Sequence, residues 1–282
     1  MPASSRLFAV CLLTAFAMAA LPRIATAGDI FPDEALEAVI KEVLRKQGKD
    51  EIKEEDLKNV FQVAAKKKGI KSLAGLEKCT SLVLIDVAGN EVEDLAPLAG
   101  LKDLQSVDLS GNKVKDIAAL KDLAKIQYLQ LEGNELADLA PLQTSKALQA
   151  LYLSGNKVTS LEPIKELPKL SSLYLEGNQV ADLKPLAGLK WLTNLNLKGN
   201  KIEDVSALAG LTELRFTFLQ DNQIKDFAPL IEMARKDAEG DKRFAPYWKL
   251  YLDGNPIDAG KRDQQIAELK KIGVRVNWQP KK

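Results

Sequence analysis

The chain has 282 residues, with 40 basic and 39 acidic side chains, two cysteines and no histidine. This balance of charge argues against a nucleic-acid-binding protein, because such proteins carry strongly basic surfaces. The absence of histidine excludes a catalytic Cys–His pair.

Residues 1–27 have the features of a secretory signal peptide. Arg6 precedes an apolar run over residues 7–21, and the small residues Ala25, Thr26 and Ala27 form a cleavage site. The run is short for a membrane span, although an uncleaved anchor is the alternative. Cleavage near Ala27 leaves 255 residues with a net charge of −1 and a single cysteine, so no intramolecular disulfide is possible. We expect a secreted, periplasmic or cell-surface protein without a membrane span after cleavage, and a monomer.

Residues 28–59 are predicted to form a helical N-terminal cap. Pro32 followed by acids suits a helix start, and Gly48 is expected to end the helix. A second short helix is expected from Ile52 to Leu57. The apolar face of the first helix consists of Leu36, Val39, Ile40, Val43 and Leu44.

Residues 60–257 form a repeat array. The stretch from Leu170 to Asn178 reads L-x-x-L-x-L-x-x-N, which is typical of leucine-rich repeats. Within each unit, alternation predicts a short strand with its leucines facing inward. The closing asparagine carries both a donor and an acceptor, so we expect it to pair with buried loop backbone. The closing asparagines are 22 residues apart from the first to the seventh, and the eighth follows after 33: Asn90, Asn112, Asn134, Asn156, Asn178, Asn200, Asn222 and Asn255.

The second half of each unit reads x-[IVL]-x-D-[LIVF]-x-P-L-x-x-L, as from Gln179 to Leu189. This segment is too short for a long α-helix and predicts a 3₁₀ turn or an extended path. The predicted fold is therefore an α/β solenoid, a leucine-rich-repeat horseshoe of eight or nine parallel strands. The sheet forms the concave face and the 3₁₀ or extended segments form the convex side.

Two units depart from the pattern. Residues 60–79 form a degenerate first repeat, with Lys68 in place of asparagine and Cys79 as a buried apolar residue. Repeat seven has Thr217 at a core position and Asp221 in place of glycine. Its return segment is longer by 11 residues, and a helix is expected over residues 229–238.

Residues 258–282 are predicted to form a C-terminal cap. A helix is expected near Lys261 to Ile272, closed by Gly273. A last strand over residues 274–278 would cover the end of the sheet. No wall-sorting motif, second domain or transmembrane tail is expected after it.

The chain resembles the internalin-type leucine-rich-repeat proteins secreted by bacteria. The resemblance rests on Ile30-Phe31-Pro32-Asp33 with Ala35-Leu36, and on 22-residue units that read N-x-[IVL]-x-D-[LIV]-x-P-L, over about residues 29–278. It implies a secreted or surface-displayed protein that grips another protein with its concave face. Internalins usually continue into an immunoglobulin-like domain and an anchor, whereas this sequence ends in a helix and a strand.

The outward strand positions are the candidate binding face. Six aromatic residues occur there, which indicates partner binding because aromatic anchors are enriched at interfaces. The alternative is that tyrosine simply favours strands. The candidate partner-binding residues are Tyr128, Glu132, Tyr152, Tyr174, Glu176, Asn196, Phe216, Phe218 and Tyr251.

The expected partner is a protein or peptide, and no cofactor, metal or catalytic residue is assigned. Glu132 and Glu176 are two repeats apart, about 9–10 Å, which is too far for a retaining glycosidase pair and at the limit for an inverting one. Aspartates that recur once per unit, such as Asp94, are expected to be structural turn residues. Acids at positions 50–56 and lysines at 66–68 are expected to be solvated. The second hypothesis for function is a structural envelope or surface-layer component without a discrete ligand.

Overall fold

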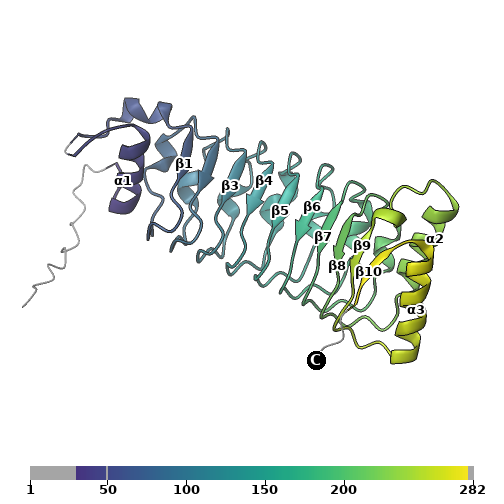
Figure 1. Cartoon of the computed structure of the whole chain (residues 1–282). Helices are drawn as coiled ribbons and strands as arrows, with labels where there is room; N and C mark the ends of the chain where they lie inside the picture. The colour runs from purple at the N-terminus through teal and green to yellow at the C-terminus, as the bar shows by residue number, and fades with distance from the viewer. Residues whose placement is uncertain (1–29, 49, 279–282) are drawn as a thin grey trace, which may run out of the picture.

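A computed structural model describes residues 30–48 and 50–278 of the chain. The predicted signal peptide, residues 1–27, lies outside the described residues. Figure 1 shows a row of strands along one side of an elongated molecule, with helix α1 at one end and helices α2 and α3 at the other.

Ten strands of the described residues form one parallel sheet in sequence order. Each strand pairs with its neighbours at the same point in the repeat, so that Leu173 lies between Leu151 and Leu195. The predicted eight or nine strands is therefore too few, because the degenerate repeat and the C-terminal cap each add a strand. The strands are β1 Gln62–Ala64, β2 Leu84–Asp86, β3 Ser106–Asp108, β4 Tyr128–Gln130, β5 Ala150–Tyr152, β6 Ser172–Tyr174, β7 Asn194–Asn196, β8 Phe216–Phe218, β9 Lys249–Tyr251 and β10 Arg275–Asn277.

Short 3₁₀ helices form the return path of the repeats, as predicted. Proline stands in the first turn of several of them, where its missing N–H leaves no bond unmade. The horseshoe thus has the sheet on its concave face and the 3₁₀ helices on its convex side. The 3₁₀ helices are η1 Glu54–Asn59, η2 Leu76–Lys78, η3 Ala96–Leu98, η4 Ala118–Leu120, η5 Ala140–Thr144, η6 Glu162–Ile164, η7 Lys184–Gly188, η8 Ser206–Gly210 and η9 Ala245–Tyr247.

The asparagines are buried and bonded to backbone, which confirms the prediction for Asn156 and Asn178. The Asn178 side-chain oxygen accepts from the Val158 N–H at 3.0 Å. Its amide nitrogen donates to the carbonyls of Leu153 at 2.9 Å and Leu175 at 3.1 Å. Each asparagine therefore ties its own loop to the loop of the preceding repeat, and together they form an asparagine ladder.

The N-terminal cap is built around α1, Glu34–Val43. One Asp33 carboxylate oxygen accepts from the backbone N–H groups of Ala35 and Leu36. The other oxygen accepts from the backbone N–H groups of Lys71 at 2.7 Å and Ser72 at 3.1 Å. Asp33 thus starts the helix and also holds it against the first repeat.

Three expectations for the cap need correction. The first helix ends at Val43, five residues before Gly48, because Arg45 takes a left-handed conformation with φ of 55°. Val43 is 37% exposed and lies outside the buried face. The second helix begins at Glu54, two residues later than predicted.

The degenerate repeat is confirmed. Val63 is buried in β1, Lys68 is exposed and Cys79 is fully buried. Burial raises the pKa of the Cys79 thiol to about 12, which keeps the sulfur protonated at neutral pH.

The insertion in repeat seven contains α2, Ala228–Glu239, which takes the place of a 3₁₀ helix and packs on η8 and on α3. Thr217 is buried, and its hydroxyl accepts a hydrogen bond of 2.8 Å from the indole N–H of Trp248, itself fully buried. The polar residue in the core therefore has a partner supplied by the residue directly before β9, in the next repeat. Helix α3, Ala259–Ile272, begins two residues earlier than predicted, behind the N-cap Asp258, and ends at Gly273 as predicted.

Candidate concave-face site

The outward strand side chains form three columns across the concave face. Strand register places Tyr152 beside Tyr174, Tyr174 beside Asn196, and Asn196 beside Phe218. Phe218 in turn lies beside Tyr251. All nine predicted residues lie in the described part of the chain. Seven are in strands, and Glu132 and Glu176 lie two residues past a strand.

The two central tyrosines form a stacked pair. The ring centroids of Tyr152 and Tyr174 are 4.8 Å apart and their planes differ by 11°. The sheet sets this spacing, because adjacent strands lie about 4.8 Å apart. Both rings are half-buried. The pair offers a flat apolar surface with hydroxyl groups at its edge.

A second aromatic pair lies further along the same column. Phe218 and Tyr251 stack with centroids 4.5 Å apart and planes 13° apart. Asn196 separates the two pairs on the intervening strand β7. The aromatic surface therefore consists of two patches rather than one continuous stripe. The order of residues along the central column in the sequence already shows this division.

Polar contacts hold Asn196 in place between the patches. Its amide nitrogen donates to the Glu176 carboxylate at 3.1 Å, and its oxygen accepts from the Lys198 N–H at 3.1 Å. Glu176 also pairs with the Lys198 ammonium at 2.9 Å. This hydrogen bond to Lys198 lowers the pKa of Glu176 and raises that of Lys198. The negative charge of Glu176 is therefore offset by Lys198 on the same face.

Glu132 is in a different setting. Burial, with the Asp108 carboxylate as a second cause, raises the pKa of Glu132, while a hydrogen bond from Ser154 opposes the shift. Burial also raises the pKa of Tyr152, with Tyr174 and Glu132 as smaller contributors. The acidic part of the face therefore lies on the N-terminal side of the tyrosine pair.

Tyr128 and Phe216 are the most exposed of the candidates, at 46% and 36%. Tyr128 pairs in register with Ala150, in the column next to the tyrosine pair. Phe216 lies under the Lys249 ammonium, whose nitrogen is 4.9 Å from the ring centroid.

The repeated aspartates have the structural role that was predicted. The Asp94 carboxylate accepts from the Ala96 N–H at 2.8 Å, and five other repeats have the equivalent bond. Among residues 30–48 and 50–278, no group of three His, Cys, Asp or Glu side chains is placed to hold a metal ion. No helix in these same ranges is both long and apolar enough to cross a membrane.

Comparison with known proteins supports the repeat assignment. A family model described as two copies of leucine-rich repeats matches residues 146–188, and a leucine-rich-repeat model matches residues 188–209. No curated protein matches the chain.

Among solved structures, the chain is similar to two proteins from Listeria monocytogenes. An internalin (inlF) is 27% identical with a TM-score of 0.76, over 90% of this chain and 72% of the other. An internalin C2 (inlC2) is 31% identical with a TM-score of 0.67, over 81% of this chain and 95% of the other. The leucine-rich-repeat ectodomain of the plant receptor kinase GASSHO1/SCHENGEN3 from Arabidopsis thaliana is 20% identical, with a TM-score of 0.62. It covers 81% of this chain and 28% of the other, and shows the shared fold alone.

Proposed function

The chain belongs to the internalin-type leucine-rich-repeat proteins, and from that premise we propose that it binds a protein or peptide partner with its concave face. The observation that carries the proposal is the stacked Tyr152–Tyr174 pair at the middle of the sheet. Tyrosine offers a large apolar area and a hydroxyl at a low cost in conformational entropy, which is why it is enriched at interfaces.

The position of the pair favours a partner over a purely structural role. Both side chains project from the sheet away from the leucine core, and Asn196 and Glu176 are held in place beside them. Fixed side chains lose little freedom on binding, so such a surface is prepared for a ligand.

We also propose that the protein is exported and that residues 1–27 are its signal peptide. Support comes from the apolar run and small-residue cleavage site, and from the family. The proposed organisation is a cap over residues 28–59, the array over 60–257 and a C-terminal cap over 258–282. Amino-terminal sequencing of the protein recovered from outside the cytoplasm should begin at Gly28.

The binding proposal is tested by capturing a partner from extracellular and envelope extracts and measuring its affinity. The Tyr152→Ala/Tyr174→Ala variant should bind at least about 30-fold more weakly, equivalent to ~2 kcal/mol, if both tyrosines are hot spots. A Lys115→Ala/Lys165→Ala variant, changed away from the sheet, is the matched control and should bind like the wild type. Circular dichroism and urea unfolding check that each variant folds.

Unchanged affinity in the tyrosine variant would overturn the central position of the site. Self-assembly or co-purification with cell wall, without a saturable partner, would instead favour a surface-layer or envelope component.

A further inference from the structure

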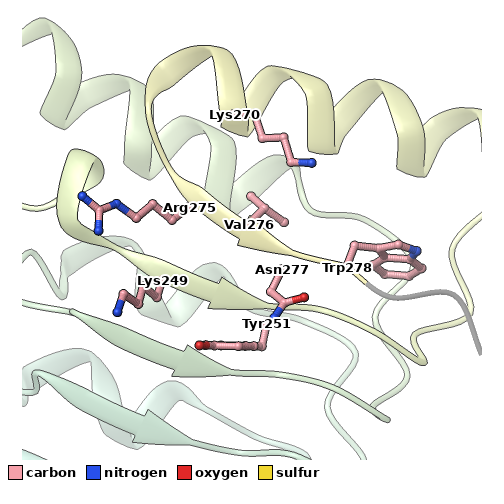
Figure 2. Close-up of a pocket in the computed structure, with 7 residues that line it drawn as sticks. All are labelled: Lys249, Tyr251, Lys270, Arg275, Val276, Asn277 and Trp278. Atoms are coloured by element: carbon pink, nitrogen blue, oxygen red, sulfur yellow. The ribbon is translucent and has the colours of Figure 1, made fainter.

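The C-terminal end of the concave face contains a shallow hollow of about 350 Å³. Figure 2 shows it between the ends of β9 and β10 and helix α3. Three of its lining residues are basic: Lys249 on β9, Arg275 on β10 and Lys270 on α3. The others that matter here are Tyr251, Asn277 and Trp278, and we call this site the cationic hollow.

Two of the three cations are paired in the sheet, and none of the three has an acidic partner among the described residues. Arg275 lies directly beside Lys249 in the sheet register, and like charges at paired positions destabilise a sheet. None of the ion pairs within residues 30–48 and 50–278 involves Lys249, Lys270 or Arg275. Both carboxylates of helix α3 already pair with cations outside the hollow: Glu268 with Arg235 and Asp263 with Arg262.

Aromatic rings fix the walls of the hollow. Tyr251 is held in its stack with Phe218. The Trp278 ring lies under the Arg262 guanidinium, 5.2 Å from its central carbon, and meets Phe227 edge-on with centroids 6.4 Å apart. Three cations beside ordered aromatic rings suit an anionic group attached to an apolar chain.

The N-terminal end of the concave face is acidic, whereas the cationic hollow lies at its C-terminal end. Asp86 and Asp108 occupy paired positions on β2 and β3, and Glu132 follows on the next repeat. An extended polyanion lying along the face would meet these carboxylates, whereas a polypeptide can present an acidic group at one end only. The charge pattern therefore favours a polypeptide ligand.

We propose that the cationic hollow binds the carboxylate side chains of an acidic segment in the protein partner. This inference rests on the proposed concave-face function and adds a direction to it. The acidic segment lies at β9 and β10, and the part of the partner that crosses β2 to β4 is neutral or basic.

The test uses peptide probes and NMR, which detects weak binding. The probe contains Phe-Glu-Glu-Phe between glycines, with both ends blocked, and the matched peptide contains Phe-Gln-Gln-Phe. The protein is labelled with ¹⁵N so that the indole N–H signals of its three tryptophans can be followed. Trp278 lines the hollow, Trp248 is buried in the core, and Trp191 is 65% exposed on a loop before β7, so the last two serve as internal controls.

The acidic peptide should shift the Trp278 signal and leave the Trp191 signal in place. The Lys249→Gln/Arg275→Gln variant should bind it about tenfold more weakly, since two ion pairs on an open, solvent-accessible surface are removed. A Lys169→Gln/Lys184→Gln variant, with the same change of charge at exposed positions away from the hollow, should bind like the wild type. The glutamine peptide should give no Trp278 shift.

Equal binding of the acidic peptide to the Lys249→Gln/Arg275→Gln variant, or no Trp278 shift in the wild type, would overturn the proposal. So would tighter binding of a heparin oligosaccharide at the same residues, because that result assigns the hollow to a polyanion.

Binding of the captured partner to the two variants distinguishes this proposal from the concave-face proposal. If the tyrosine variant loses the partner and the Lys249→Gln/Arg275→Gln variant does not, concave-face binding stands and the hollow is refuted. If neither variant loses the partner, the concave-face proposal also fails.

Discussion

The asparagine that closes each repeat forms hydrogen bonds with backbone groups of its own turn and of the preceding repeat. Asn178 bonds one N–H and three carbonyls, and two of these four groups, the Val158 N–H and the Leu153 carbonyl, belong to the preceding repeat. Aspartate can only accept, so the Leu153 and Leu175 carbonyls would each lose one of two donors and keep only the bond from Asn156 or Asn200. The choice of asparagine therefore follows from hydrogen-bonding capacity rather than from size.

Replacement of Asn178 by leucine should destabilise the protein by ~1–3 kcal/mol, because it leaves the buried Val158 N–H unpaired and takes one donor from each of the Leu153 and Leu175 carbonyls. The free energy of unfolding in urea measures the effect, with Gln179→Leu at the adjacent exposed position as the control. Fast hydrogen exchange of the Val158 amide in the wild type would contradict the premise, since that N–H is bonded to Asn178.

Eight repeats end at the asparagines from Asn90 to Asn255, and each has one inward-facing residue at the centre of its strand. Thr217 is the only one of these eight residues that is not aliphatic. The repeat pattern alone suggests that an aliphatic residue would be better there. The structure indicates the reverse, because the hydroxyl accepts from the buried Trp248 indole.

Thr217→Val, which keeps the shape of the side chain, should therefore destabilise the protein by ~1–3 kcal/mol by leaving the indole N–H unpaired. A double-mutant cycle with Trp248→Phe isolates the interaction, because the second change removes the donor. A Thr217→Val variant as stable as the wild type would show that the hydrogen bond contributes nothing net.

At the scale of elements, the strict 22-residue period explains why the strands and 3₁₀ helices could be predicted. The period fixes which residue follows which in every column, so Tyr152 and Tyr174 had to be neighbours. The period does not reveal side-chain bonds that form between columns, and the hydrogen bond from Asn196 to Glu176 is one of these. Helix ends in the caps were predicted less well, because nothing repeats there and a left-handed Arg45 is not a usual stop signal.

The last repeat aspartate also attaches the C-terminal helix. Asp226 accepts from the Ala228 N–H at 2.9 Å, as its counterparts do in their own turns. It also accepts from Gln265 at 2.6 Å and Lys261 at 2.8 Å, both on α3. These bonds, with the Gln265 contact first, lower the pKa of Asp226 to about 2.

Because this folded pKa is below the unfolded value of about 3.9, the carboxylate stabilises the docked helix above about pH 4. That contribution is lost as the pH falls from about 4 toward 2. Asp226→Asn should show a smaller fall in melting temperature across this window than the wild type, and Asp122→Asn, at an exposed site, should behave as the wild type does. An equal fall in melting temperature between pH 4 and pH 2 for all three proteins would contradict the role of Asp226.

At the scale of the whole molecule, every repeat packs mainly on its two neighbours, so stability depends on each interface in turn. Leu173 is fully buried at the middle of the array. Leu173→Ala should cost ~2–5 kcal/mol through lost burial and the cavity left behind. Urea unfolding followed by circular dichroism measures this cost, and the outward neighbour Ser172→Ala should change it little. A transition that splits into two phases would show that the two halves of the array unfold separately, and an unchanged transition would refute the core position.

The asparagine ladder also determines how the molecule should respond to mechanical force. Its bonds cross every boundary between neighbouring coils, and no covalent link other than the chain joins one coil to the next within the described residues. If the two ends were pulled apart, coils would detach one after another from an end, each extending 22 residues of chain. At about 3.4 Å per residue each step lengthens the molecule by roughly 70 Å. A tethered copy would therefore yield gradually under load and would retain the inner part of its sheet while the outer coils open.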